Sequence, residues 1–177
     1  MQYPANTDRQ KDDVLLNTHM QYTLKGTLNT EDPSVQAYAH TLAQRIRRDV
    51  EFNLRSTAKM LYWLENPDVE LVHPIVIVEH PRGITGVHPG RTRFLAAALL
   101  NRPCPCVVRT HNKRTTTTLN ALRVDAYKPR RVQTVHAFEN SLRDVYMARA
   151  KELEQEYAHL SAYDFYCCVL GVQRPSA

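Results

Sequence analysis

One stretch of the sequence predicts a helix that has no polar side. The seven residues from Phe94 to Leu100 read FLAAALL, and a helix that is apolar all round has to be buried in a protein core. A β-branched segment, Ile84–Val87, and a turn over residues 88–93 precede this helix, and a second apolar segment, Cys104–Val108, follows it. The rest of the chain therefore has to build a core around this strand, turn, helix and strand.

The turn before the helix has the composition of an anion site. Pro89 fixes its own φ, whereas Gly90 permits a close backbone approach or a positive φ. The N–H groups at a helix start point into such a turn, and the helix dipole favours negative charge there. Arginine side chains add guanidinium groups, which recognise phosphate through paired hydrogen bonds. We predict a phosphate site at His88, Gly90, Arg91, Thr92 and Arg93. In this site His88 either hydrogen-bonds a phosphate oxygen or braces the turn.

The same stretch resembles the core of the ParB/sulfiredoxin superfamily. That family has a PIxV strand, a short hairpin, a G-x-x-R-x-x-A-A turn and helix, and a strand that opens with a proline. The similar segments in this chain are Pro74–Val78, Ile84–Val87, Gly90–Ala97 and Cys104–Val108. An amphipathic segment before Pro74 is similar to the helix that precedes the PIxV strand in the family.

The resemblance implies an α+β fold, with a small mixed sheet and packed helices, and a nucleotide such as ATP or CTP, with Mg²⁺, as the ligand. It implies that Gly90, Thr92 and Arg93 bind the phosphates. Arg91 departs from the family, since sulfiredoxins carry a catalytic cysteine at this position and ParB-type CTPases carry a glutamate. A guanidinium stays protonated and only donates hydrogen bonds, so it replaces neither the nucleophile nor a carboxylate metal ligand. We expect the family's phosphate binding here without its known chemistry.

A reaction at this turn would need a carboxylate from another part of the chain. The two candidates are Glu79, at the end of the PIxV strand, and Asp125, on a later predicted strand. Glu79 is nearer in sequence and is the candidate catalytic residue, although a solvated strand end is the simpler interpretation. An enzyme of this kind would be a nucleotide-dependent phosphotransferase or phosphohydrolase.

Composition limits the class of protein. The 177 residues are 43% hydrophobic and 23% charged, which is typical of a globular domain with appendages. We expect an N-terminal arm over residues 1–30, the ParB/sulfiredoxin-like domain over 31–132 and a C-terminal helical segment over 133–177. No apolar run approaches about 20 residues and no signal peptide is evident, so we expect a cytoplasmic protein without a membrane partner. The four cysteines have no zinc-finger spacing, and we expect free thiols and no metal site.

The formal charge of +5 suggests an acidic partner. Basic residues gather in three stretches, and they form a polyanion surface only if they converge in space. The candidate nucleic-acid-binding residues are Arg45, Arg48, Arg109, Lys113, Arg114, Lys128, Arg130 and Arg131. The alternatives to a nucleotide-binding domain are thus a non-enzymatic DNA- or RNA-binding protein and an adaptor or inhibitor of an acidic protein. A virus or mobile element is a natural source for such a small basic domain, and its location would then be the host cytoplasm.

Helices are predicted on both sides of this core. Asp32 and Pro33 begin one that runs to about Asp49. The next is capped by Asn53 or Ser56, stops at Asn66–Pro67, and contains Trp63, for core packing or for base stacking.

Two further helices are predicted at the C-terminal end. A long apolar stripe over residues 134–160 indicates either docking on the domain or a homodimer. The segment Ser161–Leu170 is predicted as a last helix that ends at Gly171.

Overall fold

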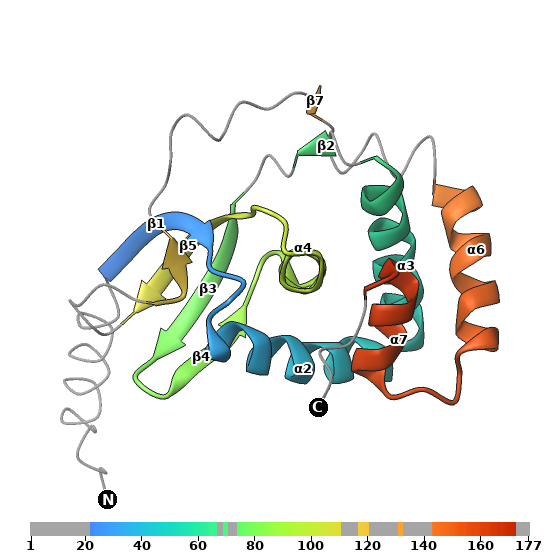
Figure 1. Ribbon diagram of the computed structural model, residues 1–177, viewed down its shortest axis with the longest axis horizontal. Helices are drawn as coiled ribbons and strands as arrows, with labels where there is room; N and C mark the ends of the chain where they lie inside the picture. Colours follow the sequence, from blue (N-terminus) through green and yellow to red (C-terminus); the bar gives the residue numbers. More distant parts are fainter. Residues whose placement is uncertain are drawn as a thin grey trace, which may run out of the picture.

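The structure is a computed structural model, and it describes residues 22–66, 69–70, 74–110, 117–120, 131–132 and 143–172. In these residues the fold is α+β, with a curled mixed sheet on one side and helices on the other (Figure 1). Several sequence predictions lie outside the described residues: Lys113, Arg114, Asp125, Lys128 and Arg130. Only the backbone of Arg131 is described.

The sheet has the strand order β4-β3-β5-β1-β6. Its strands are β1 (Tyr22–Leu28), β3 (Ile75–His80), β4 (Gly83–Val87), β5 (Pro105–Thr110) and β6 (Leu119–Asn120). β3 and β5 are parallel, and the other neighbouring strands are antiparallel. A separate parallel pair joins β2 (Val69–Glu70) to β7 (Arg131–Val132). Residues 22–28, which we assigned to an N-terminal arm, thus form a strand inside the main sheet.

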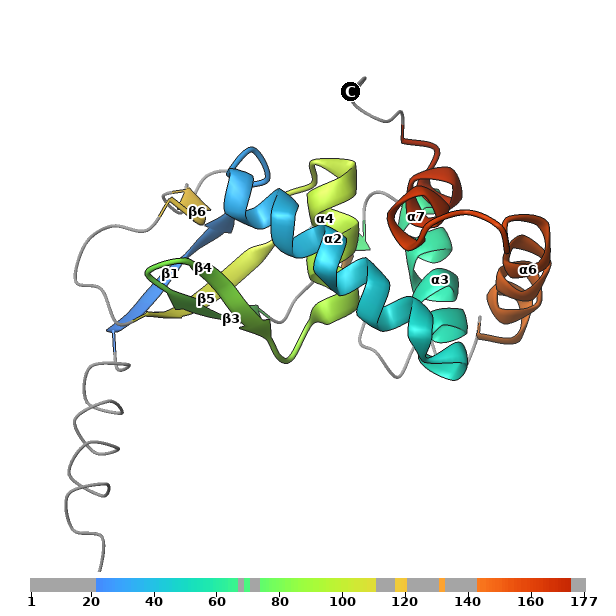
Figure 2. The same cartoon turned by 90° about the horizontal axis from the view of Figure 1, so that it is seen from below.

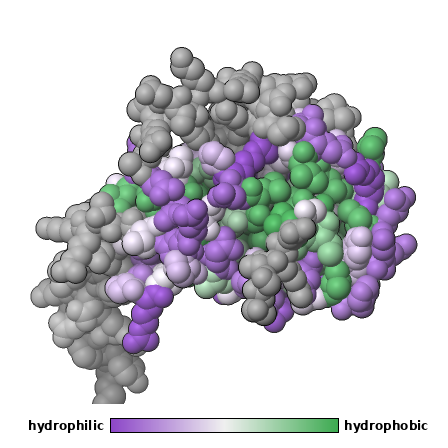
Figure 3. All heavy atoms as spheres, in the orientation of Figure 1, coloured by the Kyte–Doolittle hydropathy of each residue, from purple (hydrophilic) through white to green (hydrophobic). Residues whose placement is uncertain are grey.

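The described helices pack around one another on a single side of the sheet. They are α2 (Pro33–Arg48), α3 (Val50–Glu65), α4 (Arg91–Leu100), α6 (Arg143–Glu156) and α7 (Ala162–Leu170). Figure 1 shows α4 end-on between the sheet and α3, with α6 beyond α3, and Figure 2 shows α2 crossing α4. On the face drawn in Figure 3, hydrophobic residues gather over the helical half of the molecule.

The helix without a polar side occupies the centre of the core, as its sequence predicts. Every residue from Phe94 to Leu99 is buried, against the sheet on one side and against α2, α3 and α7 on the others. Ile75 and Ile77 of β3 and Val108 of β5 have no exposed surface either. α4 runs through the middle of the molecule and connects β4 to β5.

One aspartate joins the first two helices. Asp49 ends α2, and its side chain accepts a hydrogen bond of 3.0 Å from the amide of Phe52 in the first turn of α3. The prediction that Asn53 or Ser56 caps the second helix is therefore wrong. Both of these side chains are buried in the body of α3, where they bond to other elements.

The last two helices are held to the first two through Arg47. Its guanidinium donates to the carbonyl oxygens of Leu160 (2.9 Å) and Tyr157 (3.1 Å), forms an ion pair with Glu154 at 3.3 Å, and lies 4.0 Å from the ring centre of Phe165. Arg47 thereby donates to two carbonyl groups beyond the end of α6, and the carbonyl of Tyr157 also accepts from the amide of Leu160 at 3.1 Å.

The apolar stripe, for which either docking on the domain or self-association was predicted, meets another helix of the same chain. Tyr146 and Ala150 of α6 are buried, and α6 packs along α3. α6 begins at Arg143 and ends at Glu156. The stripe residues before 143 lie outside the described residues.

Candidate phosphate-binding turn

Gly90 is held against the start of β3. The amide of His88 donates to the carbonyl of Val76 at 2.9 Å, and the amide of Val76 donates to the carbonyl of Pro89 at 3.1 Å. These bonds continue the β3–β4 hairpin up to the helix start. Gly90 then adopts a φ of 108°, a conformation that other residues rarely take, with its α-carbon against Ile75.

The first turn of α4 begins without a side-chain cap. Gly90 is the N-cap residue, and the amide of Phe94 donates to its carbonyl at 2.8 Å as the first intrahelical bond. Because a glycine N-cap offers no oxygen to the amides that follow it, these amides and the positive end of the helix dipole are presented to whatever enters the turn. This backbone arrangement is the one predicted from the sequence.

Arg93 lies half-buried beside Gly90. One guanidinium nitrogen, Nη2, is 3.2 Å from the position that a Cβ on Gly90 would occupy. Burial lowers the pKa of Arg93, and the nearby thiols of Cys104 and Cys106 act in the opposite direction. An arginine keeps its proton even so, which places a partly desolvated positive charge at the turn. Such a charge favours an anion more strongly than a fully hydrated one does.

Thr92 faces α3 through its side chain. It is buried, and its hydroxyl lies 2.9 Å from the hydroxyl of Ser56, which is also buried. We predicted a phosphate contact for Thr92, and this geometry leaves that role to its backbone amide. The hydroxyl pair fixes the first turn of α4 against α3.

Arg91 is exposed and stacks on an aromatic ring of α3. Its guanidinium carbon is 4.6 Å from the ring centre of Phe52, within the range of a cation–π contact. His88 is exposed as well. The turn therefore has an exposed rim formed by His88 and Arg91, and an inner side formed by Arg93.

The candidate catalytic residue is not brought to the turn. Glu79 lies four residues along β3 from Ile75, which is about 13 Å at the usual rise of a strand. Its carboxylate accepts a hydrogen bond of 2.7 Å from the hydroxyl of Thr118. Glu79 therefore interacts with the β6 side of the sheet, away from any group bound at Gly90.

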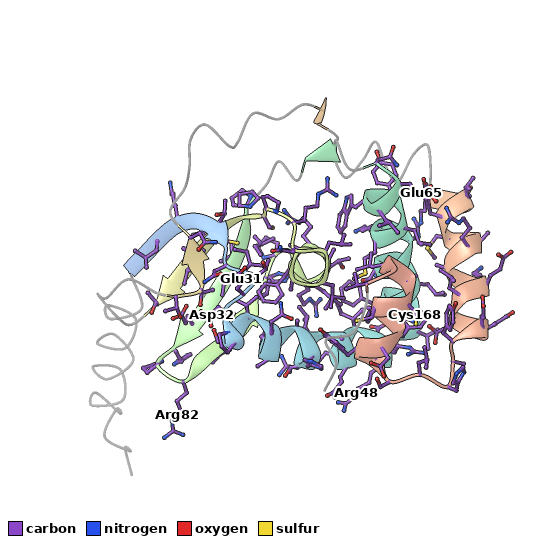
Figure 4. The ribbon with its side chains drawn as sticks, viewed as in Figure 1. Glu31, Asp32, Arg48, Glu65, Arg82 and Cys168 are labelled. Atoms are coloured by element: carbon purple, nitrogen blue, oxygen red, sulfur yellow. The ribbon has the colours of Figure 1, made fainter. Side chains whose placement is uncertain are left out.

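The described basic candidates are distributed over the molecule. Arg109 pairs with Val78 on the part of β5 away from the turn. Arg45 contacts its neighbour Tyr38 on α2, at 3.4 Å from the hydroxyl and 6.0 Å from the ring centre. Arg48 is exposed at the end of α2, where Figure 4 labels it. Of the predicted site residues that the structure describes, only those at 88–93 lie close together.

Phe52 and Ser56 belong to the surroundings of the turn, and we did not single out either for that role. They stand four residues apart and so share one face of α3. Their helical spacing was visible in the sequence, but nothing local indicated that this face meets the turn.

No group of three or more histidine, cysteine, aspartate or glutamate side chains suited to a metal ion is found in the part of the chain that the structure describes. Among the same residues, no helix is long and apolar enough to cross a bilayer. Comparison of the chain with protein family models, with curated proteins and with solved structures gives no match.

Proposed function

We propose that this chain is a nucleotide-binding domain of ParB/sulfiredoxin type that holds a phosphate group at the first turn of α4. The observation that carries the proposal is the geometry of Gly90, whose φ of 108° and contact with Ile75 present the uncapped helix start beside the Arg93 guanidinium. A phosphate there would meet backbone amides, the helix dipole and a partly desolvated positive charge. No reaction is part of the proposal, since Glu79 lies away from the turn.

The order of the elements supports the same proposal. The chain runs from β3 through the hairpin strand β4 and the turn into α4, and then into β5, which is the order that the resemblance implies. The glycine and the arginine of the G-x-x-R box, Gly90 and Arg93, are the two residues that lie side by side at the helix start.

Thermal denaturation in the presence of nucleotides tests this function. The ligands are ATP, CTP and inorganic phosphate, each with and without Mg²⁺, at low salt and at about 0.3 M salt. We expect at least one nucleotide to raise the unfolding temperature at both salt concentrations, because a lone nucleotide neutralises few charges. The absence of any shift with every nucleotide would contradict the proposal.

Arg93 provides the variant that localises the binding. Arg93→Ala is expected to weaken nucleotide binding by about 1.5–3 kcal/mol, the usual value of a charge-assisted hydrogen bond. Arg82→Ala is the matched control, because Arg82 is exposed at the β3–β4 turn and points away from the body of the molecule (Figure 4). Arg93→Lys keeps the charge at this half-buried position and is the second variant if the alanine form does not fold. Wild-type affinity in both Arg93 variants would contradict a phosphate site at this turn.

A further inference from the structure

One face of α3 carries a row of basic and aromatic side chains. Phe52, Arg55, Lys59 and Trp63 follow one another at steps of three and four residues, which places them on a single stripe of the helix. Arg55 is exposed, and the other three are half-buried. This stripe contains no carboxylate.

Both ends of α4 reach this stripe. At the start, the Arg91 guanidinium lies over the ring of Phe52, and Thr92 meets Ser56 on the same side of α3. Past the other end, Nη1 of Arg102 donates to the backbone carbonyl of Trp63 at 3.2 Å. We call the six residues Phe52, Arg55, Lys59, Trp63, Arg91 and Arg102 the basic-aromatic strip. It starts at the turn and follows α3 for eleven residues, or about 16 Å.

Two carboxylates of α3 stand near the strip: Glu51, one turn before Arg55 and without an ion pair to it among the described residues, and Glu65. Glu65, at the end of α3, turns to α6, where it accepts from the Tyr146 hydroxyl at 2.7 Å and pairs with Arg149. Within the described part of the chain, Arg55 and Arg91 form no ion pair with a carboxylate. The strip thus combines positive charges for phosphates with planar groups, the two rings and the stacked guanidinium of Arg91, on which bases stack.

From this arrangement we propose that the strip binds a single-stranded nucleic acid, one of whose phosphates occupies the turn at Gly90. The inference rests on the proposed phosphate site and extends its ligand from a nucleotide to a strand. About 16 Å accommodates roughly five nucleotides at about 3.4 Å each, and fewer when the strand is extended. In a duplex the faces of the bases are stacked on one another, and an acidic peptide has no bases. Neither ligand would therefore stack on the aromatic side chains of the strip.

Binding of oligonucleotides of graded length tests the inference on the full chain. The probes are a mononucleotide, single-stranded oligothymidylates of about two, five and ten nucleotides, and a duplex. We expect affinity to rise with length up to about five nucleotides and then to level off, with a duplex of the same length binding more weakly. Trp63 is the sole tryptophan of the chain, and its fluorescence should be quenched by the longer single strands and not by the mononucleotide.

Arg55→Ala separates the strip from the turn. It should weaken binding of the five-nucleotide strand about fivefold and reduce the salt dependence by about 0.7 in the slope of log K against log salt, the value for one phosphate. Binding of the mononucleotide should stay at the wild-type level. Arg82→Ala removes the same charge at an exposed site away from α3 and should change neither.

The outcomes distinguish the two proposals. Nucleotide binding without any gain from strand length would overturn the strip and leave the turn in place. The absence of binding by every probe would overturn both. Tighter binding of the duplex, or full competition by poly-glutamate, would also overturn the assignment to single strands and would indicate a double helix or an acidic protein instead.

Discussion

The α-carbon of Gly90 lies against Ile75 so closely that a Cβ at position 90 would come within 2.2 Å of the Ile75 Cγ2 atom. Gly90 also has a φ of 108°, which is unfavourable for any residue with a side chain. We expect Gly90→Ala to lower the free energy of unfolding by about 2–4 kcal/mol, from backbone strain and overpacking together. Urea denaturation measures this loss.

A second glycine of the same hairpin is the control for Gly90. Gly86 lies in β4, and a Cβ there meets nothing within 4 Å. Gly86→Ala is expected to change stability by less than about 1 kcal/mol. Equal effects of the two substitutions would mean that the contact between Gly90 and Ile75 does not constrain the turn.

The hydroxyl pair of Ser56 and Thr92 is suited to a double-mutant cycle. Ser56→Ala leaves the buried hydroxyl of Thr92 without its 2.9 Å partner and should cost about 1–3 kcal/mol. Combining it with Thr92→Val removes both polar groups, and the double variant should lose less than the sum of the two single changes. Chemical denaturation of the four proteins gives the coupling, and strict additivity would show that the pair contributes nothing.

Arg47 should have a larger effect on stability than its neighbour Arg48. The Arg47 side chain is only 13% exposed and bonds to carbonyl groups after α6 and to Glu154, whereas Arg48 is exposed. Arg47→Ala is expected to cost about 2 kcal/mol, and Arg48→Ala less than about 0.5 kcal/mol. Thermal unfolding followed by circular dichroism compares the two. Similar midpoints would contradict the role of Arg47 in docking α6 and α7.

Asp32 should make part of the stability depend on pH. Burial acts to raise its pKa, but the nearby Thr117 hydroxyl and the hydrogen bonds of 2.9 Å from the amide and hydroxyl of Ser34 outweigh burial, so the pKa lies below its ordinary value. Both Ser34 bonds reach Oδ1, while Oδ2 has no hydrogen bond of ordinary geometry among the described residues, so we attribute the lowering mainly to Ser34.

A carboxyl group whose pKa is lowered by folding stabilises the protein above the unfolded value of about 4, and this contribution is lost as the pH falls through the folded value. Asp32→Asn retains a capping side chain without the charge, and Asp32→Ala should cost about 1 kcal/mol at neutral pH. The difference in unfolding free energy between the wild type and Asp32→Asn should be largest above pH 4 and shrink below it. A constant difference from about pH 7 to pH 3 would contradict this assignment.

The four cysteines should differ sharply in reactivity. Cys168 is exposed on α7 (Figure 4), whereas Cys104, Cys106 and Cys167 are buried. A hydrogen bond with the side chain of Cys104, together with burial, raises the pKa of Cys106. Burial raises the pKa of Cys167. Since the thiolate is the reactive form, alkylation of the native protein at neutral pH should modify Cys168 first, as peptide mass analysis would show. Rapid modification of either thiol would contradict the burial of Cys104, just before β5, and of Cys106, within β5.

Local signals in the sequence predicted much of the helical structure. Asp32 and Pro33 begin α2, as their cap and first-turn preferences require, and Gly171 ends α7 with a φ of 64°. The uniformly apolar run after the turn predicted a buried helix, and residues 94–99 of α4 are all buried. In each case the determining interaction lies within a few residues of the signal.

The start of α3 was predicted wrongly because one residue has two functions. Asp49 was taken only as the end of the first helix, whereas its side chain also caps the second. Asn53 resembled a cap because its amide favours helix starts, but in the fold it is buried and accepts from the Tyr166 hydroxyl at 2.5 Å. That partner lies on α7, 113 residues later, and no local pattern identifies it.

In the candidate site, too, the features set by neighbouring residues were predictable and those set by distant contacts were not. The turn at 88–93 is a continuous segment, and its conformation follows from Gly90 and the helix after it. The approach of Phe52 and Ser56 depends on the packing of α3 against α4, which sequence periodicity does not orient. Glu79 was chosen for its nearness in sequence, but the direction of β3 carries it away from the turn.

The position of β1 in the sheet has a consequence for synthesis on the ribosome. β1 has no other described neighbours than β5 and β6, and Tyr22 pairs with Thr110, so Tyr22 waits for 88 further residues (110 less 22) before its partner is synthesised. At about 5–20 residues per second this interval is roughly 4 to 18 seconds. During that time β1 is a nascent strand with unpaired edges, which is the state most exposed to chaperones and to aggregation.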